Sequence, residues 1–175
     1  IYLLREGAGD GPRVQLLGSG AILREVIAGA DLLEADYGIA SDIWSVTSFT
    51  ELRRDGLEVE RWNRLHPTDE QRLPYVEQTF SGRVGPFVAA TDYMRAFADQ
   101  IRPFVKGRYS VLGTDGFGRS DYRVKLRQFF EVDRFHVVVT ALKGLADDGL
   151  IAPDVVQDAI ERYGIDADLD APWHR

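Results

Sequence analysis

Short apolar runs typical of β-strands alternate along this chain with segments that repeat apolar residues at helical spacing. This alternation constrains the fold more than any other feature. The strand-type runs lie at 1–4, 14–17, 43–46, 87–90 and 109–112. Between the second and third runs, apolar residues recur every three or four positions from Ile22 to Leu33, and Gly38 ends the segment. Because alternating strands and helices form a largely parallel sheet covered on both faces, the sequence predicts an α/β three-layer sandwich.

Capping residues and helix breakers divide the segment that follows the third run. Ser48 and Glu51 form an S-x-x-E capping box, which indicates a helix start. Gly56 is expected to break this helix, because glycine is a poor helix former. A second helical piece follows up to Leu65, where Pro67 stops it. The sequence therefore predicts two short helices in this segment.

Further helices are expected in the second half of the chain. The segment FHVVVT, residues 135–140, has strand propensity, but its apolar residues continue at helical spacing to Leu145, so a helix is favoured. The predicted helices are Pro74–Phe80, 92–102, 121–130 with Ser120 as N-cap, 133–148 with Asp133 as N-cap, and a last helix from Pro153 to Gly164.

Composition and charge exclude several classes of function. The chain has 175 residues, no cysteine and a net charge of −7, so it forms no disulfides. It also offers no basic stripe to a nucleic-acid backbone. No apolar run approaches the ~20 residues that a membrane span needs. We therefore predict a cytoplasmic protein without nucleic-acid or membrane partners. Because the chain starts at Ile1 rather than Met, we expect residues 1–175 to be a single domain of a much longer chain.

The segment SVLGTDGFGRSD, residues 110–121, is the strongest candidate for a functional site. A strand-type run ends in Gly113, a loop with two more glycines follows, and a charged helix start comes next; open α/β sheets place ligands or partners at such elbows. Backbone amides here could hold an anion, but no lysine accompanies them, and the two aspartates of the segment would repel phosphate. Phe117, between two glycines, is typical of an aromatic residue that docks into a partner. The elbow is therefore predicted to be an interface loop, with the residues Asp115, Gly116, Phe117, Gly118, Arg119, Ser120 and Asp121.

An earlier elbow, LLGSGAIL, begins like a dinucleotide-binding fingerprint. Gly18 and Gly20 are in place, but Leu23 stands where the third glycine belongs. Val46 and Thr47 follow the next strand-type run instead of the acid that would bind a ribose. The small residues are explained more simply as a means of bringing a helix close to the sheet. We therefore predict no cofactor site at this elbow.

The remaining candidate side chains form no catalytic or metal-binding pattern. None of His66, His136 and His174 has a second histidine or acid at metal-ligand spacing, and His174 is expected to be mobile. The serines lack the G-x-S-x-G context of a nucleophile. Trp44 and Trp62 are interpreted as core aromatics. We predict no catalytic residue, no cofactor-binding residue and no metal ligand in this chain.

Taken in order, these segments resemble a known family. The chain contains VQLLGSGAILREV, SDIWSVTSFTELRRDG, ERWNRLHP, PFVAATDYMRAFADQI and SVLGTDGFGRSD, with FEVD before the next helix. Together they closely resemble the C-terminal part of the homodimeric bacterial pyruvate dehydrogenase decarboxylating component, over practically the whole chain. More distantly, the first elbow, the FG-x-S turn and the F-x-V-D helix start are similar to the C-terminal domain of transketolases.

The resemblance implies both a fold and a division of roles. It implies a sheet of five strands, four parallel and one antiparallel, in which Ile1–Leu4 is the antiparallel strand. The family's full subunit uses thiamin diphosphate and Mg²⁺ to decarboxylate pyruvate, and it acetylates a lipoyl group carried by an acetyltransferase component. The family's cofactor motif, a G-D-G followed by an N-N, is absent here. The resemblance therefore implies that catalysis belongs to other domains and that this domain supports the subunit homodimer.

Three hypotheses for function follow. The first is a non-catalytic domain that completes the dimer of a thiamin-dependent pyruvate dehydrogenase. The second is a free-standing regulatory domain that binds a small anion at the elbow between Gly113 and Ser120. The third is an independent oxidoreductase that uses the elbow Gly18–Gly20, and the incomplete fingerprint disfavours it.

Overall fold

The computed structural model describes all residues from Ile1 to Arg175 and is built on one five-stranded mixed sheet. The strands are β1 (Tyr2–Arg5), β2 (Arg13–Gly18), β3 (Ala40–Ser45), β4 (Phe87–Ala90) and β5 (Tyr109–Leu112). They lie in the order β1-β3-β2-β4-β5, with β1 antiparallel to β3 and all other neighbours parallel. The predicted α/β class and the antiparallel first strand are confirmed.

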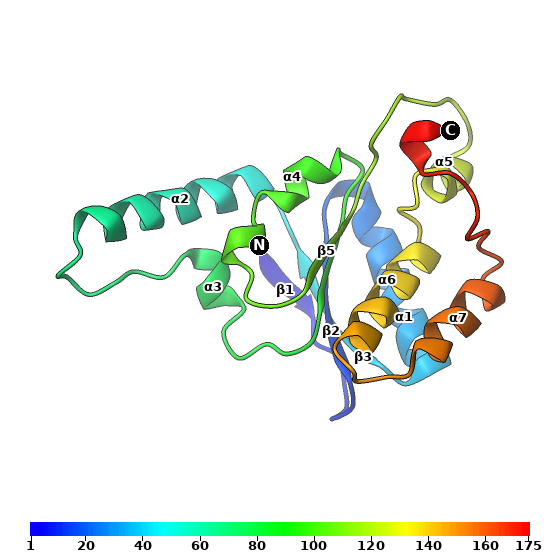
Figure 1. The fold of residues 1–175 in the computed structure, drawn as a ribbon, viewed down its shortest axis with the longest axis horizontal. Helices are drawn as coiled ribbons and strands as arrows, with labels where there is room; N and C mark the ends of the chain where they lie inside the picture. The colour runs from blue at the N-terminus through cyan, green and yellow to red at the C-terminus, as the bar shows by residue number, and fades with distance from the viewer.

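Helices cover both faces of the sheet (Figure 1). On one side lie α1 (Leu23–Tyr37), α6 (Arg134–Asp147) and α7 (Pro153–Arg162), which packs on α6. On the other side lie α2 (Phe49–Leu65), α3 (Tyr75–Thr79), α4 (Arg95–Asp99) and the 3-10 turn η2 (Arg102–Phe104). Three further elements complete the fold, namely η1 (Gly20–Ile22), α5 (Arg123–Phe129) and η3 (Pro172–His174). No helix is long and apolar enough to span a bilayer.

The central strand β2 explains why the fold has three layers. Val14 and Leu16 belong to the core beneath α1 and α6, whereas the neighbouring Leu17 belongs to the core beneath α2 and α4. All three side chains are fully buried. Successive side chains of a strand point to opposite faces, so a strand covered on both sides reads as a continuous apolar run. β2 follows this pattern except at Gln15, which is also buried.

The predicted break at Gly56 is wrong. Helix α2 runs without interruption from Phe49 to Leu65 and extends away from the body of the molecule (Figure 1). A Cβ atom at position 56 would lie 2.3 Å from two ring atoms of Phe104. The glycine therefore serves a close approach of the helix to its neighbour rather than a helix end.

Helix ends account for most of the other differences. Ser48 and Asp133 accept backbone hydrogen bonds from Glu51 and His136, at 3.2 and 3.0 Å, so both predicted caps are confirmed. Ser120 is not an N-cap, because α5 begins three residues later, at Arg123. The helix predicted over 92–102 is only the short helix α4, with a separate 3-10 turn that contains a proline at its start.

Candidate functional site

The elbow loop, residues 113–121, follows β5 at the carboxyl end of the parallel strands. From β2 the chain continues to β3 on one side, whereas β4, on the other side of β2, continues to β5. The loops after β2 and β4 therefore diverge, which makes this end of the sheet a topological switch point. Open α/β sheets bind their ligands in the crevice at such a point.

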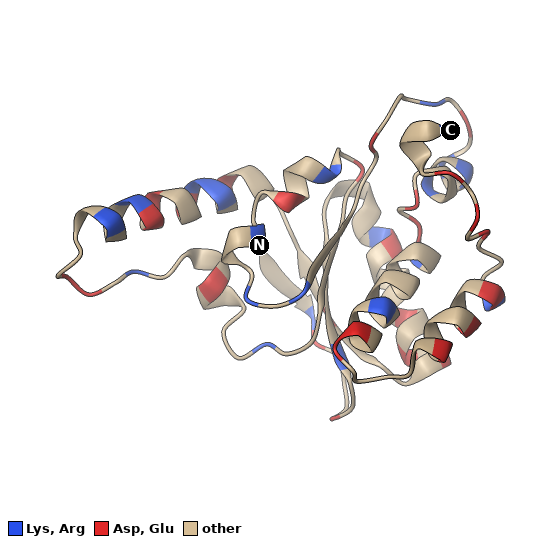
Figure 2. Ribbon diagram, in the orientation of Figure 1, with Lys and Arg blue, Asp and Glu red and all other residues tan.

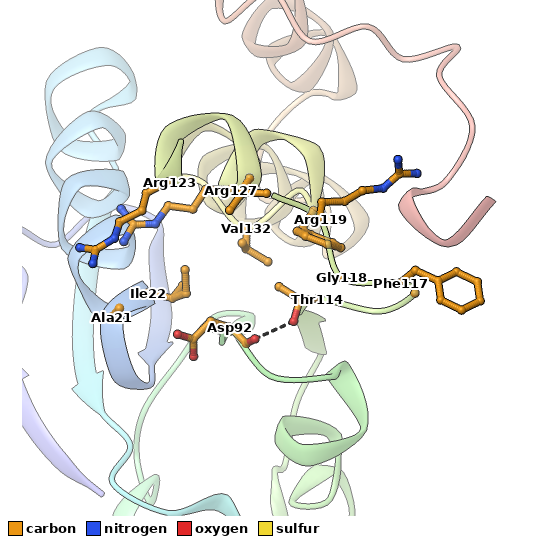
Figure 3. A pocket seen from close by; sticks show the side chains of 13 residues that line it. Ala21, Ile22, Asp92, Thr114, Phe117, Gly118, Arg119, Arg123, Arg127 and Val132 are labelled. Carbon is orange, nitrogen blue, oxygen red and sulfur yellow. Dashed lines mark hydrogen bonds between the residues drawn. The ribbon is translucent and has the colours of Figure 1, made fainter. Parts of the chain in front are cut away.

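A cavity of about 490 Å³ occupies this crevice. Its volume falls within the ~300–1,000 Å³ that small-molecule sites span. The lining comes from η1, from the loops after β4 and β5, from α5 and from the segment that follows α5. The lining residues are Ala21, Ile22, Asp92, Thr114, Gly116, Phe117, Gly118, Arg119, Arg123, Leu126, Arg127, Phe130 and Val132 (Figure 3).

Two arginines of α5 extend side by side toward the α1 end of this cavity (Figure 3). Nη1 of Arg127 donates to Oε1 of Glu25 at 2.6 Å, and Nε of Arg134 donates to Oε2 of the same carboxylate at 3.0 Å. Arg123, by contrast, lines the cavity and takes part in no ion pair. The helix is locally basic although the chain as a whole is acidic (Figure 2).

The buried Glu25 carboxylate joins three helices. Only 4% of Glu25 is exposed. Burial alone would raise the pKa of Glu25, but the hydrogen bonds and positive charge of Arg134, with the charge of Arg127, outweigh it and hold the pKa below its ordinary value. The carboxylate therefore stays charged and connects α1 to α5 and α6.

The elbow loop has an outer face and an inner face. Phe117 is 89% exposed and points away from the cavity, as does Arg119 (Figure 3). On the inner side, the hydroxyl of Thr114 donates to the carbonyl oxygen of Asp92 at 2.6 Å. Asp115 accepts the backbone N–H of Arg95 at 3.0 Å and pairs with its guanidinium at 3.6 Å. The inner side of the loop is thus held by these contacts, while Phe117 at its tip faces solvent.

The C-terminal tail packs against the loop from a second side, and the predicted mobility of His174 stays a prediction. His174 lies in η3, next to Trp173, whose Cα would be 3.0 Å from a Cβ atom at Gly116. Trp173 also stacks on the guanidinium of Arg95, 4.9 Å from the ring centre. Gly116 has a φ of 101°, which favours glycine. The tail and the elbow are therefore packed together.

The rest of the predicted interface residues lie around this junction. Arg119 donates to the carbonyl oxygen of Arg175 and covers the ring of Phe129. Gly118 has open space around it, and Ser120 is exposed. Asp121 accepts the N–H of Tyr122 at 2.7 Å. The structure brings residues 115–121 together as one projecting loop, and their role at an interface stays a prediction.

The glycines of the first elbow serve close packing. A Cβ atom at Gly18 would lie 2.8 Å from Cα of Leu23, so the start of α1 touches the end of β2. A Cβ atom at Gly20 would lie 3.3 Å from a carboxylate oxygen of Asp92. That carboxylate therefore lies beside the elbow, where a ligand phosphate would meet its negative charge.

The histidines and tryptophans have structural partners. His136 Nδ1 lies 2.7 Å from Oδ1 of Asp133, the cap of α6. His66 stacks on Trp62. Trp44 is buried, as predicted, but Trp62 is only half-buried and lies under the guanidinium of Arg72, so its assignment to the core is wrong. No group of three or more His, Asp or Glu side chains is arranged to hold a metal ion.

Sequence reasoning missed the charged lining of the cavity. Arg123 and Arg127 are four residues apart, which places both arginines on one side of a helix. That spacing can be seen in the sequence, but the two aspartates of the elbow suggested a site that would repel anions. In the structure Asp115 and Asp121 bond to backbone N–H groups instead of lining the cavity.

Comparison with known proteins places these observations in a family. The family model described as the transketolase-like TK C-terminal domain matches residues 1–133. The pyruvate dehydrogenase E1 component of Cupriavidus necator is 57% identical over 174 residues, which are 98% of this chain and 19% of the relative. The Pseudomonas aeruginosa protein is 59% identical over 98% of this chain and 20% of the relative. The Escherichia coli protein is 55% identical over 98% of this chain and 19% of the relative. The chain thus spans about a fifth of the length of these relatives.

Solved structures share the fold. Transketolase from Campylobacter jejuni aligns with a TM-score of 0.52 at 20% identity, over 81% of this chain and 18% of that chain. Transketolase from Pichia stipitis, in complex with sedoheptulose 7-phosphate, aligns with a TM-score of 0.54 at 16% identity, over 85% and 18%. At such identities the likeness concerns the fold alone. The family model, which covers most of the chain, decides the assignment: this chain belongs to the transketolase-like C-terminal domain family.

Proposed function

We propose that this chain is the C-terminal domain of a pyruvate dehydrogenase subunit and that it supports the assembly of two such subunits through the outer face of the elbow loop. The first part of the proposal is supported by identities of 55–59% to E1 components over 98% of the chain. The second part is supported by Phe117, an aromatic side chain held 89% exposed on a fixed loop. Aromatic anchors of this kind dominate protein interfaces.

The parent enzyme that this proposal implies is cytoplasmic and depends on thiamin diphosphate. It decarboxylates pyruvate and acetylates the lipoyl group of an acetyltransferase component, which would be its partner alongside the second subunit. This chain would contribute no catalyst. Its share would be to hold the pair of subunits in the arrangement that the active site requires.

The residues of this chain do not fit the cofactor itself. A diphosphate-bound Mg²⁺ needs several oxygen ligands grouped at one point. No group of three or more His, Asp or Glu side chains is arranged in that way. Asp92 adds a negative charge to the crevice where a diphosphate would otherwise lie. We therefore assign thiamin diphosphate and Mg²⁺ to other domains of the parent.

The assembly role is tested by Phe117→Ala in the full-length subunit. Loss of a central aromatic anchor is expected to weaken dimer association about tenfold or more, measured by analytical ultracentrifugation. Because the ring contacts solvent, the melting temperature of the 175-residue chain should stay unchanged. Asp115→Asn should also weaken association, because Asp115 fixes the loop through Arg95.

Val84→Ala provides the matched control. Val84 is also apolar and exposed, at 63%, but it precedes β4 at the opposite end of the strands. It should leave association unchanged. Equal dimer stability in Phe117→Ala and Val84→Ala, or a stable and active dimer of a subunit that lacks these 175 residues, would overturn the proposal.

A further inference from the structure

On one side of the cavity at the switch point, an arginine has no carboxylate partner. Arg123 and Arg127 are four residues apart on α5, so they are neighbours, and like charges at this spacing repel each other. Glu25 binds one edge of the Arg127 guanidinium, with 2.6 Å between Oε1 of Glu25 and Nη1 of Arg127. The other N–H groups of Arg127 are free. Arg123 has no carboxylate partner. An anion between the two arginines would relieve their repulsion.

Beside the arginines, the cavity offers an apolar floor. Ile22, Phe130 and Val132 line it and are buried, with 2%, 8% and 1% of their surface exposed. Leu126, from the inner side of α5, adds to the same surface. A few convergent charged groups above an apolar surface are the usual composition of a small-molecule site.

The remaining charge in the cavity restricts what could bind. Asp92 lies across the cavity from the two arginines and shows its carboxylate below Ile22 (Figure 3). A second anionic group on that side would be repelled. The arrangement therefore favours a ligand with one anionic head and a neutral, apolar body.

We propose that this cavity binds a small organic anion whose carboxylate or phosphate head is held by Arg123 and by the free edge of Arg127, with its apolar body on Ile22, Phe130 and Val132. The groups that would hold the anion are charged side chains of α5, whereas the sequence suggested the backbone amides of the elbow. Phe117 and Arg119 belong to the rim of the cavity, but their side chains point away from it, so the inner site and the outer face proposed for assembly use different side chains (Figure 3). The inference does not depend on the assembly role.

Titration calorimetry of the 175-residue chain with three probes tests the proposal. Phenyl phosphate and benzoate combine one anionic head with the same apolar body, and they separate a phosphate site from a carboxylate site. Inorganic phosphate has the head without the body. At least one of the two aromatic anions should bind saturably, and if phenyl phosphate does, inorganic phosphate should bind about tenfold more weakly, because it buries no apolar surface.

Arg123→Gln is the decisive variant, because it removes the unpaired guanidinium without breaking an ion pair. It should weaken binding of the aromatic anion about tenfold, the usual size of a hydrogen bond to a charged group. Lys125→Gln is the matched control, since it removes one charge from the same helix but from a residue outside this cavity. Its effect should stay below about twofold, because exposed charges are screened by salt.

Two results would overturn the proposal. One is the absence of saturable binding of every probe to the unmodified chain. The other is an equal loss of binding in Arg123→Gln and Lys125→Gln, which would indicate a general effect of charge. The assembly proposal is tested by dimer association of the full-length subunit, and this one by binding of the aromatic anions to the 175-residue chain, so a failure of either gives a different result.

Discussion

At the scale of single residues, the absence of a side chain at Gly56 allows α2 to lie close to Phe104. Alanine is the better helix former by about 1 kcal/mol, so helix propensity alone predicts that Gly56→Ala stabilises α2. Packing predicts the opposite, because the new methyl group would lie 2.3 Å from the ring of Phe104. Overpacking costs about 1–3 kcal/mol, so after the propensity gain of about 1 kcal/mol we expect a net loss of up to about 2 kcal/mol in the free energy of unfolding, measured by urea denaturation.

A second substitution separates packing from propensity. Phe104→Leu removes the outer ring atoms, so the alanine should cost less in the double variant than in the chain with Phe104 intact. If Gly56→Ala were more stable than the unmodified chain by about 1 kcal/mol, which is the full gain in helix propensity, the close approach of α2 would be of no energetic consequence.

Single residues were also where prediction from the sequence was weakest. Gln15 and Asp42 lie inside strands and are fully buried, where the apolar pattern of the sheet gave no reason to expect polar groups. Their amide and carboxylate bond to each other at 2.9 Å, and Gln15 accepts the indole N–H of Trp44 at 2.8 Å. Arg13 pairs with the same carboxylate at 2.5 Å. Such a network depends on which strands are neighbours, and that information is not local.

At the scale of elements, Glu25 makes the contact between α1, α5 and α6 sensitive to pH. Its pKa is lowered in the folded chain relative to the ordinary 4.5. The stability that it contributes is therefore fully present above pH 4.5 and is lost as the pH falls through the lower native value. Glu25→Gln should cost about 1–3 kcal/mol at neutral pH, because a charged hydrogen-bond acceptor is lost.

Urea denaturation across an acidic pH series checks this prediction. The difference in unfolding free energy between the unmodified chain and Glu25→Gln should shrink as the pH falls below 4.5, because Glu25 then becomes protonated. Glu34→Gln, an exposed acid on the same helix, controls for the loss of one negative charge. A difference that does not change with pH would mean that the carboxylate charge contributes nothing to the contact.

Helices and strands were predicted well where a local sequence signal exists, and poorly where contacts with a distant segment determine the structure. The caps at Ser48 and Asp133 and all five strands could be read from the sequence, because capping and periodicity act over a few residues. The position of the tail around Trp173 could not, since it depends on contacts with Arg95 and Gly116 from the loops after β4 and β5. The cavity was missed for the same reason, because η1 and α5 meet only in the folded chain.

At the scale of the whole molecule, one face of the sheet is left partly uncovered without the segment beyond the matched family region. The family model ends at residue 133, but α6 begins at Arg134 and covers β4 and β5 beside α1. Five of its side chains are fully buried in that core, namely Val137, Val138, Ala141, Leu142 and Leu145. Burial of five such side chains contributes roughly 10 kcal/mol. The whole net stability of a domain is only about 5–15 kcal/mol.

A chain that ends at residue 133 should therefore not fold cooperatively. Circular dichroism in a urea series should show no sigmoidal unfolding transition, because one face of the sheet would be open to water. A chain that ends at residue 150 keeps α6 and loses α7, whose Val156 and Ala159 add less buried surface. It should unfold cooperatively at a lower urea concentration than the whole chain. A two-state transition in the shorter chain would show that α1 and the sheet are sufficient, and that α6 only adds to a core already formed.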